Sequence, residues 1–236
     1  MKIQRFTALA LPALLAAATA AAQQPAAPAG GKDHGAIIKE SLQKSAVALK
    51  QYQWVETTVI SIKGDEKSRQ QQNCYYGADG ALQKTPIGAP PEEKKKRGIR
   101  GAVAEDKKEE ISGAAKEAVG LVKLYVPPDP ARIQSAKDTG RLSVTPPDKQ
   151  GNVVVVIKDY LKPGDSLTLS LNAATNLLTG IKVATFTDSA KDAVDLNVTM
   201  GAFPDGTVYA SAIQLTVASQ KLGVAITNSG YKKLGS

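Results

Sequence analysis

The chain has 236 residues, of which 42% are hydrophobic and 22% charged, with 30 Lys and Arg against 22 Asp and Glu and a net charge of +8. This composition is too apolar for a disordered chain. The single His and the single Cys exclude a Cys/His zinc site and a framework of intramolecular disulfides.

Residues 1–22 have the three parts of a secretory signal peptide. Two basic residues precede an apolar run that contains leucines, and small residues then end in an A-x-A pattern at Ala22. The sequence therefore predicts cleavage before Gln23 and a location in the periplasm or outside the cell. The alternative, a membrane anchor, is disfavoured because the run contains Pro12 and is shorter than the roughly 17–25 apolar residues of a spanning helix.

Residues 23–34 are rich in Ala, Pro and Gly without any period, and we interpret them as a flexible tether. The remainder, 35–236, is expected to form a single domain, since a chain of this length can bury one sizeable core. A helix is predicted over residues 35–51, where Ile38 and Leu42 lie on one apolar face.

A meander of strands and then a helical insertion follow the first helix. The strands are predicted at 54–63, 68–76 and 81–85, because these segments are separated by short Gly- and Asp-containing turns. The helical insertion is predicted near 102–138, with apolar residues at helical offsets over 103–126. A second short helix in it begins at Asp129 as N-cap and Pro130 in the first turn.

Every predicted element after Gly140 is a strand, because turn residues divide the sequence at short intervals. The predicted strands are 141–145, 152–158, 166–171, 180–187, 193–201, 207–219 and 222–231. In 166–171, leucines alternate with serines and threonine, which indicates one face on a core and the other in water.

These elements predict an α+β fold that is mainly antiparallel β. We expect about ten strands to form a strongly curved, incomplete β-barrel with helices packed in its concave face. That geometry leaves an apolar space between helices and sheet that suits a hydrophobic ligand. The residues expected to line this ligand cavity are Ile38, Leu42, Trp54, Ile60, Val119 and Val122.

No set of residues has the spacing of a catalytic site. His34 falls at the end of the tether, without the rigid support that a general base requires. Cys74 has no His partner, so we interpret it as a half-buried structural thiol, with intermolecular pairing as the alternative. The acidic residues at 188, 192 and 195 lack the spacing of a calcium loop. We therefore expect no enzyme activity, no cofactor and no metal.

The strongest charged feature is a basic run in the loop before the second helix, formed by Lys94, Lys95, Lys96, Arg97 and Arg100. Export argues against a nucleic-acid partner for this run. We expect it to contact anionic lipid head groups at a membrane surface or an acidic protein partner. The alternative is a solvated loop, since acidic residues flank the run on both sides.

Three segments of the C-terminal half resemble a known group of proteins. They are KDYLKPGD at 158–165, LLTGIKV at 177–183 and FPDGTVY at 203–209. Together with the element order, they resemble secreted bacterial members of the LolA-like periplasmic lipoprotein-carrier superfamily. The resemblance implies an unclosed antiparallel barrel that is covered by helices and encloses a cavity for acyl chains. The segments are mainly strand and turn patterns, so no binding residue is transferred from the family.

Two classes of function remain open at this point. The first is non-enzymatic binding or carriage of a lipid, a lipoprotein acyl chain or another hydrophobic ligand, which predicts space between sheet and helices. The second is a structural or sensor-type module that binds an envelope protein, which predicts a tightly filled interior.

Overall fold

The computed structural model describes residues 34–88 and 99–235; the predicted signal peptide, residues 23–33 of the predicted tether and the run Lys94–Arg97 lie outside this part. The helices are α1 (His34–Ala48), α2 (Ile99–Val122) and α3 (Pro130–Asp138), with short 3-10 turns η1 (Leu49–Gln51) and η2 (Ala190–Asp192). The strands are β1 (Tyr52–Ile62), β2 (Asp65–Tyr76), β3 (Leu82–Pro86), β4 (Leu142–Val144), β5 (Asn152–Lys158), β6 (Ser166–Asn172), β7 (Leu178–Phe186), β8 (Ala193–Ala202), β9 (Val208–Val217) and β10 (Leu222–Lys233).

The strands form one antiparallel sheet of ten strands, in the order β3-β2-β1-β10-β9-β8-β7-β6-β5-β4. Neighbours in the sheet are neighbours in the sequence, except where β1 pairs with β10. Because β3 and β4 are each paired on one side only, the sheet does not close. The predicted mainly antiparallel, incomplete barrel is therefore confirmed.

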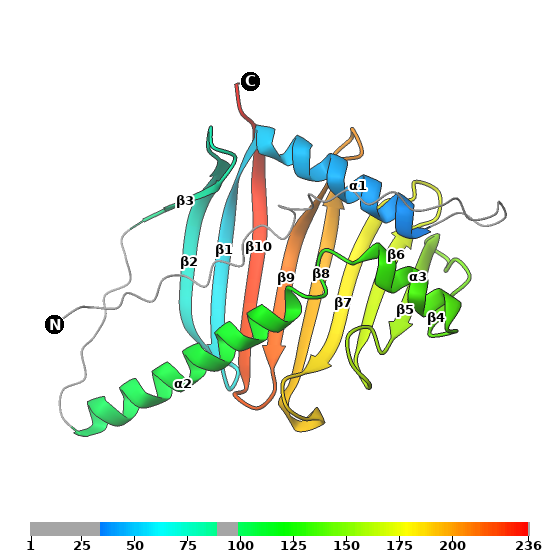
Figure 1. Ribbon diagram of the computed structural model, residues 1–236. Helices are drawn as coiled ribbons and strands as arrows, with labels where there is room; N and C mark the ends of the chain where they lie inside the picture. The colour runs from blue at the N-terminus through cyan, green and yellow to red at the C-terminus, as the bar shows by residue number, and fades with distance from the viewer. Residues whose placement is uncertain (1–33, 89–98, 236) are drawn as a thin grey trace.

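All three helices lie on the same side of the sheet (Figure 1). In this view α1 passes in front of the upper ends of the central strands, and α2 passes in front of the lower part of β1 and β10. α3 lies in front of the strands at the β4 edge. The prediction of helices in the concave face is confirmed by this arrangement.

The second helix differs from its predicted range of 103–126, because it begins at Ile99 and ends at Val122. The residues before Pro127 and Pro128 form a turn instead, since a proline disfavours helical conformation in the residue that precedes it. Tyr125 consequently leaves the helix, but it is fully buried in the core.

The main core lies between the helices and the concave face. In β6, Leu167, Leu169 and Leu171 are buried, whereas the polar residues between them are half-exposed, as the alternation predicts. From the C-terminal half of α2, Ala118 and Val122 are fully buried in the same cluster. Their small side chains allow this half of the helix to approach the sheet closely.

The turn between β5 and β6 is fixed to the end of α2 by a buried carboxylate. Asp165 accepts hydrogen bonds from the backbone N–H groups of Tyr160 at 2.6 Å and Lys162 at 2.9 Å. The hydroxyl of Tyr125 donates to Asp165 Oδ2 at 2.5 Å and lies 2.7 Å from Thr185 Oγ1. Burial raises the pKa of Tyr125, so this hydroxyl keeps its proton and remains a donor. The KDYLKPGD segment thus has a structural role.

Removal of the Tyr125 hydroxyl tests this anchor. We expect Tyr125→Phe to lower the free energy of unfolding by about 1–3 kcal/mol, because Asp165 and Thr185 lose a buried partner. The measurement is the urea unfolding midpoint. Tyr75→Phe is the matched control, since Tyr75 is exposed at 37%, and it should change the free energy by less than about 0.5 kcal/mol. Equal effects of the two substitutions would contradict the assignment.

Candidate functional site on the concave face

The residues predicted to line a ligand cavity lie in two places. Ile38, Leu42, Val119 and Val122 are buried in the main core cluster, and Ile60 is half-buried and packs against it. Trp54 belongs to a second, separate cluster. The structure therefore brings five of the six residues into one cluster, and their role in ligand binding stays a prediction.

The predicted basic contact site cannot be placed. Lys94, Lys95, Lys96 and Arg97 lie outside the described residues. Arg100 is in the first turn of α2, but its side chain is likewise outside the described part. Its contact with head groups or with a partner stays a prediction.

The second cluster is aromatic and lies where α1 runs into β1 through η1. The Trp54 ring stacks on Tyr231 with ring centroids 5.6 Å apart and lies 6.0 Å from Tyr76. Phe203 and Tyr209 stack at 4.5 Å in the same cluster. These rings form a second hydrophobic cluster on the sheet, separate from the aliphatic main core.

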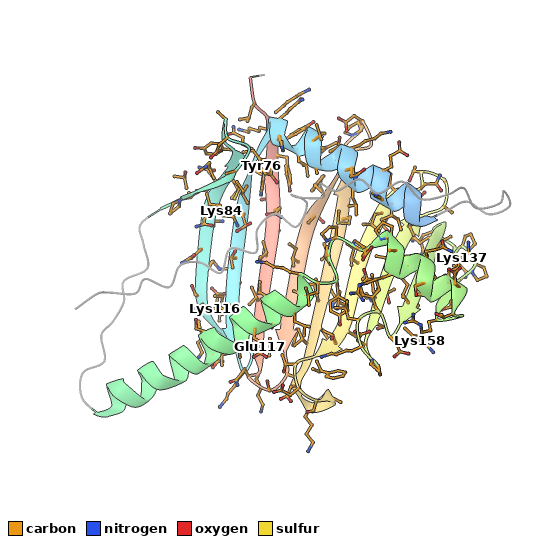
Figure 2. All side chains as sticks on the ribbon, in the orientation of Figure 1. Tyr76, Lys84, Lys116, Glu117, Lys137 and Lys158 are labelled. Carbon is orange, nitrogen blue, oxygen red and sulfur yellow. The ribbon has the colours of Figure 1, made fainter. Side chains whose placement is uncertain are left out.

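A buried ion pair lies next to the aromatic cluster. Lys84 Nζ donates to both carboxylate oxygens of Glu56, at 2.7 Å and 2.8 Å. The two side chains are only 11% and 8% exposed. Figure 2 places Lys84 in front of β2 and below Tyr76. We call Glu56, Thr58, Lys84 and Asn228 the polar cluster.

The register of the sheet brings the polar cluster together from three strands. Glu56 lies directly opposite Asn228 of β10 and opposite Gln72 of β2. The Thr58 hydroxyl lies 3.5 Å from Glu56 Oε1 and is buried. Glu56 was not among the residues predicted from the sequence. A signal was nevertheless present, because Glu56 occupies an inward position in the alternation of Trp54, Thr58 and Ile60.

Two buried polar atoms near this cluster have no hydrogen-bond partner among the described residues, Trp54 Nε1 and Asn228 Oδ1. The amide nitrogen of Asn228 donates to the carbonyl of Ala210 at 2.9 Å, so of the two polar atoms of this amide the oxygen is the one without a partner. Buried polar atoms are almost always hydrogen-bonded in native proteins, so each exception calls for an explanation.

Two surface depressions lie away from the predicted cavity residues. One of about 350 Å³ is lined by Asp129, Ala131, Arg132, Ser135, Arg141 and Tyr160. Another lies on the outer face of α1, around Val47. Both are open and shallow, and neither touches the polar cluster.

Residues 34–88 and 99–235 contain no group of three or more His, Cys, Asp or Glu side chains that could hold a metal ion. None of the helices in this part of the chain is long and apolar enough to cross a membrane. Asp192 accepts a hydrogen bond from Ser189 at 2.8 Å in its own turn.

Comparison with known proteins gives distant structural likeness only. No protein family matches the sequence, and no curated protein matches it significantly. The chain is similar to a DUF1329 family protein from Desulfovibrio piger, with 7% identity, a TM-score of 0.39, and coverage of 86% of this chain and 92% of that one. It is also similar to a putative outer membrane lipoprotein-sorting protein domain from Vibrio parahaemolyticus, with 9% identity, a TM-score of 0.37, and coverage of 86% and 94%.

A third solved structure, the Pseudomonas aeruginosa MucA/MucB complex, contains a chain with 10% identity and a TM-score of 0.23, covering 86% of this chain and all of that one. The lipoprotein-sorting domain bears the name of the class that the sequence resembles. Scores and identities this low carry no argument about function.

The energetic role of the ion pair can be tested by removing one partner and then both. We expect Lys84→Met to lower the free energy of unfolding by about 3 kcal/mol, because Glu56 is left as an uncompensated buried charge. The double variant Glu56→Met/Lys84→Met should recover most of that loss. Urea unfolding provides the measurement, and Arg69→Met, which breaks the exposed pair with Glu66, should change stability by less than about 1 kcal/mol. A double variant as unstable as the single one would refute this account.

The thiol of Cys74 offers an independent probe of the same region. Burial, reinforced by the nearby Glu56 carboxylate, raises the pKa of Cys74 to about 11. At pH 8 about one thiol in a thousand is then ionised. We expect Ellman's reagent to react with the native protein at least about a hundredfold more slowly than with the urea-unfolded chain. Equal rates would show that Cys74 is exposed, and the signal is unambiguous because the chain has one Cys.

Proposed function

We propose that the protein is a non-enzymatic binder or carrier of an acyl chain or another hydrophobic ligand, which lies on the concave face beside α2. In this proposal the protein is exported and acts in the cell envelope. The basic run ahead of α2 meets anionic head groups there, as its charge predicts.

The proposal rests on one observation, which is the unequal burial along α2. Ala118 and Val122 of its C-terminal half are fully buried. Further toward the N-terminus Ile111 is only half-buried, and so are Ile60 and Ile62 on the inward face of β1. Aliphatic side chains from a helix and a sheet are thus left partly in water on the side where a core is expected.

An apolar chain that covers these side chains is favoured by the hydrophobic effect. Burial of apolar surface contributes about 25 cal/mol per Å², or about 0.8 kcal/mol for each methylene group. An alkyl chain laid on Ile60 and Ile62 gains this free energy on both sides of the contact. Tyr125 fixes the segment that follows α2 to Asp165, so we assign the ligand to the part of α2 beside Ile111 rather than to its C-terminal end.

The alternative function is a module that binds an envelope protein. It is favoured by the filled half of the concave face, where Leu167, Leu169 and Leu196 have no exposed surface. In that case the half-buried isoleucines belong to a protein interface, and no lipid accompanies the purified protein.

Mass spectrometry distinguishes the two functions. We expect an organic extract of the protein, purified without detergent from cells that contain native lipids, to yield a stoichiometric acyl or lipid species. An extract that stays clean even after incubation with native lipids would refute lipid binding and favour the protein-interaction module.

A pair of neighbouring substitutions tests the location of the ligand. Ile60→Asn places a polar amide on the inward face of β1, and we expect at least about a tenfold loss of bound lipid per protein, which corresponds to about 1.4 kcal/mol. Val59→Asn is the matched control, because Val59 is also half-buried but points to the opposite face. The measurement is the lipid-to-protein ratio in the extract. Equal losses in both variants would contradict this location.

A further inference from the structure

The polar cluster lies on the same inward face as the apolar surface assigned to the ligand chain. Glu56 and Ile60 are both inward-facing residues of β1, and the Glu56 and Lys84 side chains are nearly buried. A buried ion pair seldom stabilises a fold more than well-packed apolar residues of similar volume. Stability alone therefore gives little reason for a charged pair at this position.

The remaining hydrogen-bonding capacity of the region can be counted atom by atom. Lys84 already donates to both oxygens of Glu56, and its charge is balanced there. Glu56 Oε1 accepts from both Lys84 and Thr58, whereas Oε2 accepts from Lys84 and retains a lone pair, and Asn228 Oδ1 accepts nothing among the described residues. On the donor side, Trp54 Nε1 lacks an acceptor. Among the described residues, the region thus offers two acceptors, Glu56 Oε2 and Asn228 Oδ1, and the unpartnered indole N–H of Trp54 as a donor.

The atoms that lack hydrogen-bond partners indicate which type of ligand head group would suit this region. A carboxylate or phosphate only accepts hydrogen bonds, so it would meet the acceptors of Glu56 and Asn228 without a donor to offer. An ammonium group only donates, so it would leave Trp54 Nε1 without a partner. A hydroxyl both donates and accepts, and it is uncharged, so its burial does not require a counter-ion.

The register indicates how many hydroxyls are needed. Trp54 and Glu56 are two residues apart on the inward face of β1, and Asn228 lies opposite Glu56. The register of the β1–β10 ladder shifts between Gln53 and Val55, so Trp54 and Asn228 occupy separate positions along it. A head group with two or more hydroxyls can serve both positions. The half-buried side chains of Gln70 and Gln72 border the site and leave it partly open to solvent.

We propose that the polar cluster and Trp54 form a subsite for an uncharged head group with several hydroxyls, such as that of a glycerol- or sugar-headed lipid. This inference rests on the proposed function, because the chain of the same ligand lies on Ile60 and Ile62. The subsite adds selectivity for the lipid head group, which apolar contacts with the acyl chain alone do not provide. The protein favours a neutral polyol lipid over a free fatty acid with the same chain.

A comparison of two probes tests this subsite. Monopalmitoylglycerol and palmitate carry the same acyl chain, and both are added to the purified protein below the concentrations at which they form micelles. Binding is measured by calorimetry and by the fluorescence of Trp54, which is the one tryptophan of the chain. We expect monopalmitoylglycerol to bind at least about tenfold more tightly, as two additional buried hydrogen bonds would produce.

Substitutions in the polar cluster and at Trp54 then test whether these residues cause the preference for monopalmitoylglycerol over palmitate. The double variant Glu56→Met/Lys84→Met should bind both probes with similar affinity, because it keeps the apolar surface and loses the charged acceptors. Trp54→Phe removes the indole N–H and keeps an aromatic ring, and calorimetry should show a preference reduced by at least about threefold. The control is Glu66→Met/Arg69→Met, which removes an exposed pair and should leave the preference unchanged.

Each outcome separates this inference from the proposed function. Equal affinity for both probes, or tighter binding of palmitate, would overturn the polyol subsite while the proposed function stands. A preference that survives in both the double variant and Trp54→Phe would also overturn it. Binding of neither probe, together with a clean organic extract, would refute the proposed function itself.

Discussion

The pairing of β1 with β10 is the interaction on which the rest of the molecule depends. Every other strand pair in the sheet joins neighbours in the sequence, so each could form within its own hairpin or meander. Within the described residues, the β1–β10 ladder, from Tyr52↔Lys233 to Ile62↔Leu222, is the strand pairing that joins the β3-β2-β1 meander to the seven strands from β4 to β10. It turns two separate sheets into one concave face, and it brings Glu56 opposite Asn228.

The two parts of the sheet that this ladder joins differ in how far their inward-facing side chains are buried. Over β5 to β9 the inward leucines, isoleucines and valines are buried beneath the helices, and the carboxylate of Asp165 fixes the turn at the end of α2. Over β1 and β2 the inward face carries an ion pair, glutamines and half-buried isoleucines. The first half supplies most of the filled main core. The proposed ligand is assigned to the second half, where Ile60 and Ile62 pack against that core but stay half-buried.

The sequence predicts the local features of this architecture well, and its long-range features poorly. The alternation of Leu167, Leu169 and Leu171 with polar residues identifies both faces of β6, because the period of a strand is a local property. The end of α2 was placed four residues too late, since helical spacing of apolar residues continues to Tyr125 although the two prolines exclude a helix there.

The candidate site was predicted only in part for the same reason. Ile60 and Val119 could be assigned to the interior from their periodicity, and the structure places both at the main core. Trp54 falls in the aromatic cluster because the register of β10 shifts opposite it, between Gln53 and Val55. No local pattern reveals that shift, nor that Asn228 would face Glu56. These contacts follow from topology, which the residue periods do not encode.

The position of the last strand has a consequence for how this protein acquires its shape. Ser61 Oγ donates to the carbonyl of Gly223, and these two residues are separated by 162 positions in the sequence. Closing so long a loop is entropically unfavourable, and sheets that depend on distant pairings fold slowly. The concave face is therefore assembled only when the carboxyl end of the chain is present. During synthesis, β1 remains an unpaired edge on the side that β10 later occupies, until the last strand has been made.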